Sequence, residues 1–317
     1  MRITSKGIVN RDQEVTFLFD SKPYKGFVGD TVASALLAND VNLVGRSFKY
    51  HRPRGILGIG SEEPNALISV HKGGKIEPNV RATTQEIYEG LIVTSQNSWP
   101  SLKFDALAIN DIIAPFFSAG FYYKTFMWPP RFWEALYEPI IRHAAGLGKL
   151  DSEPDVDNYD QNFAFCDLLI IGGGPSGLFS ALLAGRAGLD VILVDENPKF
   201  GGRLLFENTI IDGNHCLDWI QSCLGELKSL KNVRLLSRAT VFGIYDQGTF
   251  GVLERISRHT HDSESDTVLD CFWRIVASRS ILASGAIERH IAFGNNDRPG
   301  IMMASAVRGY LNHFGVA

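Results

Sequence analysis

The stretch from Cys166 to Asp195 constrains the fold more than any other part of the sequence. An apolar run leads into the G-x-G-x-x-G segment 172–177, an alanine- and leucine-rich segment follows at 178–188, and a second apolar run at 191–194 ends at the acid. The order is strand, glycine turn, helix, strand and carboxylate. This order is typical of the βαβ unit that binds a dinucleotide.

Each glycine of the segment has a separate physical role. Gly172 permits the tight turn out of the strand, Gly174 lets the backbone approach a pyrophosphate, and Gly177 lets the helix pack closely on the sheet. Pro175 and Ser176 lie between the last two glycines, at the start of the helix. The free N–H groups and the positive dipole end of that helix are expected to face the phosphates. We therefore predict cofactor contacts at all five residues.

The acid after the second apolar run predicts how the ribose is bound. A carboxylate at the tip of the second strand accepts hydrogen bonds from the adenosine ribose hydroxyls, which argues against a 2′-phosphate there. Asp195 is the first candidate for this role and Glu196 is the second. The alternative is a βαβ unit that holds no ligand.

Three residues farther along the chain are expected near the same site. Arg203 ends a Gly-Gly-Arg segment, which in two-dinucleotide-binding flavoprotein folds passes close to the dinucleotide; the alternative is a solvated arginine. Val241 lies at the start of an expected β-meander whose first turn passes the adenine. Gly285 closes a strand-like run that is similar to the second dinucleotide motif of these folds.

The chain before the glycine turn divides into two regions. Residues 15–19 and 24–28 flank a turn sequence and predict a hairpin, and Thr31 is placed to cap a helix over 32–38. A hairpin followed by a capped helix suggests a small β-grasp domain, which we place at residues 1–98. Residues 99–160 are rich in aromatic residues and then acidic, which predicts a connecting arm and a linker.

The aromatic arm has two interpretations. An amphipathic membrane helix is one, but Pro129 and Pro130 break it and cations do not line an opposite face. We therefore expect an arm buried against its own domains or against a partner subunit. Residues 161–317 are then expected to form a doubly wound α/β dinucleotide-binding domain. We expect this domain to be truncated at its C-terminus, before its remaining strands.

Composition excludes several classes of protein. The formal net charge is −4, and four cysteines are scattered without a C-x-x-C pair, which disfavours a metal site, a redox dithiol or a secreted disulfide framework. Neither a signal peptide nor an apolar run long enough to span a bilayer is present, so we expect a cytoplasmic protein without a membrane partner. The basic, aromatic segment 45–55 is poor support for a nucleic-acid partner in an acidic chain.

That basic segment also carries a resemblance to a known family. Residues 47–55, with the sequence Ser-Phe-Lys-Tyr-His-Arg-Pro-Arg-Gly, resemble the N-terminal ferredoxin-like domain in the α subunit of heterotetrameric sarcosine oxidases. The segment 120–126 is similar to the same subunit. In iron–sulfur members of the wider group, cysteines follow this motif, whereas residues 56–67 here contain none. Because cluster ligation needs thiolates, we predict a ferredoxin-like domain without an iron–sulfur centre.

The resemblance implies a reaction carried out by a complex. It implies β, γ and δ partner subunits, a small-molecule amine substrate, FAD and FMN in the complex, and NAD in this chain. Sarcosine would be oxidised to glycine with formaldehyde and hydrogen peroxide, or with 5,10-methylenetetrahydrofolate when tetrahydrofolate is bound in a C-terminal part beyond this chain. The catalytic residues are unknown, because the histidines are dispersed and no general base or nucleophile stands out.

Two other functions fit the same residues. One is an FAD- or NAD-binding subunit of a dehydrogenase for another amine, such as proline or an opine, since FAD and NAD versions of the βαβ site use the same glycines and ribose acid. The other is a scaffold whose dinucleotide is only structural.

Overall fold

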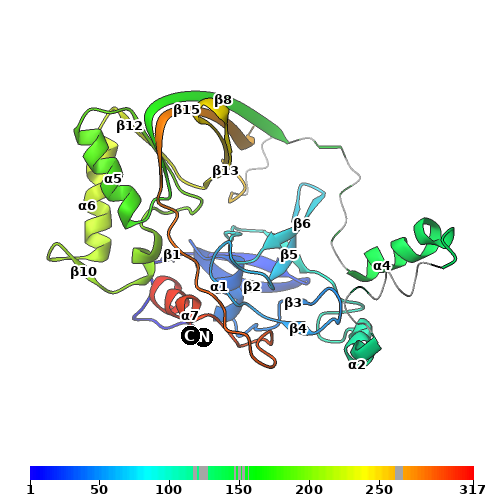
Figure 1. The fold of residues 1–317 in the computed structure, drawn as a ribbon. Helices are drawn as coiled ribbons and strands as arrows, with labels where there is room; N and C mark the ends of the chain where they lie inside the picture. The colour runs from blue at the N-terminus through cyan, green and yellow to red at the C-terminus, as the bar shows by residue number, and fades with distance from the viewer. Residues whose placement is uncertain are drawn as a thin grey trace. The chain divides into compact units, whose positions relative to one another are not determined.

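The computed structural model describes most of the chain and divides it into two compact units (Figure 1). The described residues are 1–116, 120, 128–145, 148, 151, 154, 155, 157–260 and 267–317. The first unit comprises Met1–Glu153 and Arg289–Ala317, and the second comprises Pro154–Glu288.

The first unit is built on a five-stranded sheet with the order β2-β1-β7-β5-β6. β1 and β2 form the predicted antiparallel hairpin, whose turn residues Asp20 and Ser21 have φ of 48° and 64°. β7 runs parallel to β1 and antiparallel to β5. This arrangement confirms the predicted ferredoxin-like domain. The strand bounds are β1 Asn10–Phe19, β2 Lys22–Val28, β5 Leu67–Lys72, β6 Lys75–Arg81 and β7 Ile92–Ser95.

The predicted cap begins the helix that follows the hairpin, α1 (Val32–Ala38). The Thr31 hydroxyl accepts the Ser34 N–H at 3.2 Å, and the Ser34 hydroxyl accepts the Thr31 N–H at 2.9 Å. This reciprocal capping box satisfies two N–H groups that the helix itself leaves unpaired. Leu36 on this helix is fully buried and belongs to the same apolar core as Phe17 of β1. A short ladder of β3 (Gly45–Arg46) and β4 (Pro53–Arg54) follows.

The aromatic arm contributes short helical segments to the first unit. Several of its large apolar side chains are exposed, with Trp99 at 66%, Phe104 at 72%, Ile112 at 79% and Trp128 at 80%. These side chains are not buried against their own domains, so for them the other alternative, burial against a partner subunit, stays a prediction. Residues 121–126 lie outside the described residues. The segments are η1 Ala106–Ala108, α2 Ile109–Ile112, η2 Ala114–Phe116, η3 Trp133–Tyr137 and α4 Glu138–Ala145.

The C-terminal segment also belongs to the first unit, which differs from the expected domain of 161–317. α7 (Ala304–Gly309) and η6 (Tyr310–Phe314) bury Ala306, Tyr310 and Phe314 in the core of the ferredoxin-like unit. These apolar side chains hold the segment there, and a pattern of apolar spacing does not say which core a helix will join. The two chain ends meet, with the Met1 amino group 3.0 Å from the Ala317 carbonyl (Figure 1).

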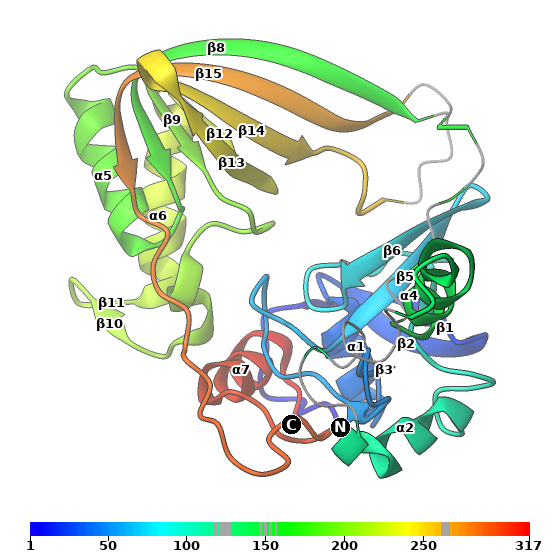
Figure 2. The same cartoon turned by 45° about the vertical axis from the view of Figure 1, so that its right-hand side comes forward.

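The second unit contains a six-stranded mixed sheet with the order β12-β9-β8-β15-β14-β13. The first four strands in this order are parallel, and β15, β14 and β13 form the predicted antiparallel meander. Figure 2 shows the long β8 and β15 running side by side. The strand bounds are β8 Asn158–Ile171, β9 Val191–Val194, β12 Val233–Leu236, β13 Ala239–Tyr245, β14 Thr249–Arg255 and β15 Val268–Leu282.

Two helices lie together against the parallel part of this sheet, α5 (Pro175–Arg186) and α6 (Cys216–Ser229) (Figure 1). Their buried side chains, such as Leu178 and Ile220, share a core with Ile170 of β8. The α/β fold with a βαβ glycine turn is therefore confirmed. Among the described residues, no helix is long and apolar enough to cross a membrane. The remaining short elements are η4 Gly202–Phe206, β10 Ile210–Ile211, β11 Asn214–His215 and η5 Asp246–Gly248.

A buried ion pair ties the N-terminus to the hairpin and to α1. Arg2 donates to both oxygens of Asp30 at 3.3 and 2.7 Å, and the same carboxylate accepts from the Phe27 N–H at 2.9 Å and the Ser34 hydroxyl at 2.7 Å. The Asp30 side chain is fully buried and that of Arg2 is 14% exposed.

We predict that Asp30→Ala lowers the free energy of unfolding by about 3–5 kcal/mol, because it leaves a buried guanidinium and two further donors without their acceptor. Urea denaturation monitored by circular dichroism measures the change. The exposed pair of Lys25 and Glu14 is the control, and Glu14→Ala should leave the urea midpoint unchanged. Equal midpoints for Asp30→Ala and the unmodified chain would contradict the role of this pair.

Candidate functional site

The backbone itself leaves no room for a side chain at two positions of the glycine turn between β8 and α5. Gly172 has φ +106°, and a Cβ built there would lie 2.4 Å from the Ala283 carbonyl oxygen. A Cβ at Gly177 would lie 1.9 Å from the Gly172 carbonyl oxygen. The Gly172 N–H donates to the Val194 carbonyl at 2.8 Å, which fixes the turn against the end of β9. Only glycine fits at both positions.

Gly174 differs from these two glycines, because the space beside it is open. It is the N-cap of α5, with φ −72° and ψ −174°, a conformation that any residue adopts. The nearest atom to a Cβ built there is the Gly202 Cα, at 4.0 Å. Pro175 and Ser176 follow at the exposed start of the helix. The free N–H groups of this helix N-terminus favour an anion.

Asp195 lies beside the turn with both carboxylate oxygens engaged. Oδ2 accepts the Gly173 N–H at 2.6 Å, and Oδ1 accepts the N–H and the side-chain amide of Asn197 at 2.8 and 3.0 Å. The residue is 7% exposed, whereas Glu196 is exposed. Asp195 therefore links the glycine turn to the end of β9. Oδ2 keeps an acceptor lone pair beyond its bond to Gly173, whereas Oδ1 already accepts two hydrogen bonds.

The Gly-Gly-Arg segment packs directly on the turn. The Gly201 N–H donates to the Gly173 carbonyl at 2.8 Å, and a Cβ at Gly202 would lie 2.9 Å from the Gly174 Cα. Arg203 points its charge into solvent, with its side chain 60% exposed and 3.8 Å from a Glu207 carboxylate oxygen. The backbone of this segment therefore lies at the turn, whereas the arginine side chain pairs with the carboxylate of the residue that follows its short helix.

Val241 lies on β13 and Gly285 lies just after the end of β15, and backbone hydrogen bonds join both segments to the region of the turn. The first residue of β13, Ala239, donates to the Asp195 carbonyl at 2.8 Å, and Val241 is half-buried two residues beyond. The Ala283 N–H donates to the Ile171 carbonyl at 2.7 Å, and Gly285 follows with φ +71°. The fold thus brings five predicted segments together near the carboxyl ends of β8, β9 and β15, namely the glycine turn, the acid, and the segments of Arg203, Val241 and Gly285.

Sequence reasoning missed Asn197 at this site. Its N–H and side-chain amide both bind Asp195, which orients the carboxylate toward the turn. An acid followed two residues later by asparagine is a local signal for such a turn, and it was available in the sequence.

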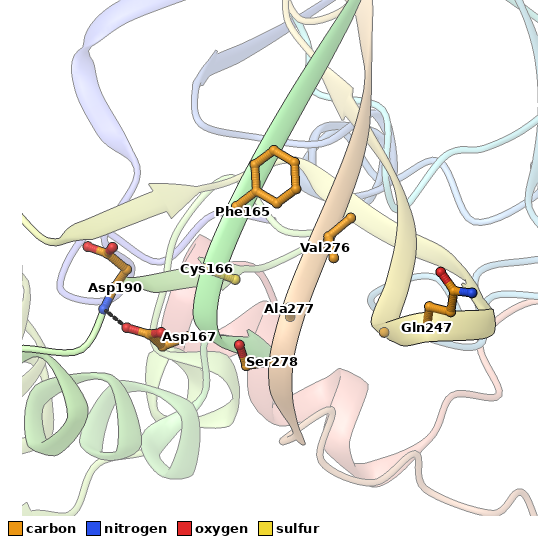
Figure 3. A pocket seen from close by; sticks show the side chains of 9 residues that line it. Phe165, Cys166, Asp167, Asp190, Gln247, Val276, Ala277 and Ser278 are labelled. Atoms are coloured by element: carbon orange, nitrogen blue, oxygen red, sulfur yellow. Dashed lines mark hydrogen bonds between the residues drawn. The ribbon is translucent and has the colours of Figure 1, made fainter.

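A pocket of about 530 Å³ lies elsewhere in the second unit (Figure 3). It lies beside the start of β9, where the Asp190 N–H donates to the Asp167 carboxylate at 2.9 Å, whereas the glycine turn lies at the other end of this strand. Burial raises the pKa of the Cys166 thiol in its wall to about 11, so this thiol is protonated at neutral pH and is a poor nucleophile. The pocket contains none of the predicted cofactor residues. Its lining is Phe165, Cys166, Asp167, Asp190, Gln247, Gly248, Val276, Ala277 and Ser278.

The basic segment of the first unit makes internal contacts. Arg52 and Arg54 bind the Asp297 carboxylate at 2.9 and 2.5 Å, and Arg46 donates to the Leu102 carbonyl. Within the same segment, the ring of His51 is fully buried, with Nδ1 2.7 Å from the Asp105 carboxylate. These contacts give the segment a structural role in the first unit. Among the described residues, no cluster of three His, Cys, Asp or Glu side chains could hold a metal ion.

Comparison with protein families divides the chain in the same way. Residues 12–98 match the family described as a 2Fe-2S iron–sulfur cluster binding domain, and residues 167–241 match the family of FAD dependent oxidoreductases. Among solved structures, the chain is similar to L-proline dehydrogenase from P. horikoshii with a TM-score of 0.65 and 20% sequence identity. The match covers 100% of this chain and 50% of that chain, and it shows a shared fold.

Two curated relatives match over essentially the whole chain. The sarcosine oxidase α subunit of Rhizobium meliloti (strain 1021) is 56% identical over 100% of this chain and 32% of its own length. That of Corynebacterium sp. (strain U-96) is 36% identical over 99% of this chain and 28% of its own length. An opine oxidase subunit of Agrobacterium tumefaciens (strain Ach5) is 30% identical over 45% of this chain and 28% of its own length. The chain is therefore homologous over its whole length to sarcosine oxidase α subunits, and it spans about a third of the length of these curated relatives.

Proposed function

We propose that this chain is the N-terminal part of the α subunit of a heterotetrameric sarcosine oxidase, and that its second unit binds NAD. The chain's contribution is then to hold a dinucleotide and to assemble with β, γ and δ subunits. The identity to two sarcosine oxidase α subunits over the whole chain supports this role.

The open space at Gly174 is the observation that carries the binding proposal. Gly172 and Gly177 are glycines because the chain itself fills the space where their side chains would be, whereas Gly174 has no such neighbour. Its lack of a side chain therefore serves something other than internal packing. A pyrophosphate at the start of α5 fits this requirement, because the backbone must approach it closely and the helix N-terminus favours its charge.

Asp195 is the residue that we propose for the ribose hydroxyls. Its carboxylate lies 2.6 Å from the Gly173 nitrogen, so a ribose next to the turn meets Asp195 first. Glu196 follows on the exposed side of the chain and is the alternative. Val241, Arg203 and Gly285 would border the same ligand, at the adenine and ribose or phosphate positions expected from the sequence.

In the complete enzyme we place the chemistry outside this chain. The reaction is the oxidative demethylation of sarcosine to glycine, with formaldehyde or 5,10-methylenetetrahydrofolate and hydrogen peroxide as the other products. FAD and FMN supply the redox chemistry, and tetrahydrofolate accepts the one-carbon group in the C-terminal part of the full-length polypeptide. The buried thiol of Cys166 and the internal pair of His51 and Asp105 offer no accessible nucleophile or base for this reaction.

A second function is an FAD-binding subunit of a dehydrogenase for another amine. The match of residues 167–241 to FAD dependent oxidoreductases and the partial identity to an opine oxidase subunit favour it. The glycine turn and its acid serve FAD and NAD equally well, so the geometry of the turn does not separate the two.

The released cofactor decides between these functions. We predict that the chain purified alone and then denatured releases NAD, and that flavin is released only from preparations that include the partner subunits. Absorbance and mass spectrometry of the supernatant identify both. FAD released from the chain alone would overturn the NAD assignment and support the second function.

Gly174→Ala tests the binding site without disturbing the turn. The added methyl group meets no atom of the chain closer than 4.0 Å, so the melting temperature should not change. Affinity for the dinucleotide should fall by about tenfold or more, because the methyl group keeps the pyrophosphate from the backbone. Isothermal titration calorimetry measures the affinity. Gly225→Ala, a helix glycine with no atom near its built Cβ, is the matched control and should bind as tightly as the unmodified chain. Unchanged affinity in Gly174→Ala would place the dinucleotide elsewhere.

Two acid variants test which carboxylate binds the ribose. Asp195→Asn should lower affinity by about tenfold or more and should also lower the melting temperature, because an amide cannot accept from both Gly173 and Asn197 as the carboxylate does. Glu196→Gln should change neither quantity. Calorimetric titration and thermal denaturation of both variants measure the effects. Loss of affinity in Glu196→Gln alone would assign the ribose contact to Glu196.

A further inference from the structure

The loop between β4 and β5 folds around one buried carboxylate. Glu63 is 1% exposed. Its Oε2 accepts the N–H groups of Leu57 and Gly58 at 2.7 and 2.6 Å, and its Oε1 accepts those of Asn65 and Ala66 at 2.7 and 3.0 Å. One side chain therefore satisfies backbone donors from both ends of the loop. Inward-pointing backbone N–H groups of this kind form an anion-binding concavity.

The neighbouring Glu62 closes the middle of the loop. Its Oε1 accepts the N–H groups of Ile59 and Gly60 at 2.7 and 3.1 Å. A Cβ at Gly58 or Gly60 would lie 2.7 or 2.8 Å from this carboxylate. The backbone can therefore approach the Glu62 carboxylate closely because both positions are glycine. Glu62 is only half-buried, so the deeper anion is Glu63.

The carbonyl groups of the loop are bound from outside by other parts of the first unit. The Tyr310 hydroxyl donates to the Gly58 carbonyl at 3.0 Å, and the Met303 N–H donates to the Leu57 carbonyl at 2.9 Å. The Thr83 hydroxyl donates to the Gly60 carbonyl at 2.7 Å. Burial, with the charges of Glu63 and Glu62, raises the pKa of Tyr310 well above its ordinary value, so its hydroxyl stays protonated as a donor.

An iron–sulfur cluster does not fit this loop, although residues 12–98 match a 2Fe-2S binding family. Cluster irons are held by cysteine thiolates, and the four cysteines of the sequence are all at position 166 or later. Four backbone N–H groups of the loop are directed at the Glu63 carboxylate. The loop already contains its own anion.

We propose that the Glu63 carboxylate takes the place of an iron–sulfur cluster as the anion around which this loop folds. The ferredoxin-like domain then reaches its structure without a metal and carries no electrons. Its shaped loop serves as the surface on which the segment from Met303 to Tyr310 packs. This inference concerns the first unit alone and does not depend on the dinucleotide proposed for the second.

Residue-resolved hydrogen exchange on two variants of the full chain tests this role. In Glu63→Gln, exchange of at least one pair of amides, either Leu57 and Gly58 or Asn65 and Ala66, should accelerate by about tenfold or more, because the amide group keeps only one of the two oxygens that accept these pairs. In the matched control Glu62→Gln, acceleration should be confined to the Ile59 and Gly60 amides. Unchanged exchange at the first four amides in Glu63→Gln would overturn the proposal.

A second measurement needs no variant, so it tests the proposal even if Glu63→Gln fails to fold. It asks whether the unmodified chain binds an iron–sulfur cluster. The unmodified chain is incubated anaerobically with ferrous iron and sulfide, and bound iron, sulfide and visible absorbance are measured after gel filtration. We expect no stoichiometric iron or sulfide and unchanged exchange protection of the same amides. One cluster bound per chain would overturn the proposal.

Discussion

Buried carboxylates that accept backbone N–H groups hold the principal loops of both units. Asp195 binds Gly173 and Asn197 in the second unit, and Glu63 binds four N–H groups in the first. A charge-assisted hydrogen bond is stronger than a neutral one, and a buried N–H without an acceptor is costly. A single acid therefore determines the path of many backbone atoms. Loss of either acid is expected to affect its whole loop.

The two loops differ in what surrounds the buried carboxylate. Around Glu63 the donors and the acceptor both belong to the chain, so the concavity is filled from within. At the glycine turn, Asp195 fixes the shape, but the space beside Gly174 is not filled by the chain. The same physical chemistry thus yields a loop filled by its own carboxylate in one unit and, in our proposal, an anion site in the other.

The first unit also shows how distant segments of the chain are joined. Arg52 and Arg54, in the basic segment, bind Asp297, and Tyr310 binds the loop at Gly58. Cations that a sequence presents as a run are here paired with a carboxylate far along the chain. Part of their charge is therefore balanced inside the unit, which explains how a basic segment can have a structural role in an acidic protein.

Local signals in the sequence were enough to predict the βαβ unit, the hairpin with its capped helix, and the meander. Each depends on neighbours along the chain: apolar periodicity, glycine spacing or a capping hydroxyl. The same local order identified Gly172, Gly177 and Asp195. Other features emerged only from the folded chain, namely that residues 289–317 pack on the ferredoxin-like core, that Trp99 and Trp128 stay exposed, and that Glu63 gathers four N–H groups. These features depend on contacts between residues that are far apart in the sequence. Apolar spacing and composition describe each segment by itself, so they do not predict which distant segments will pack together.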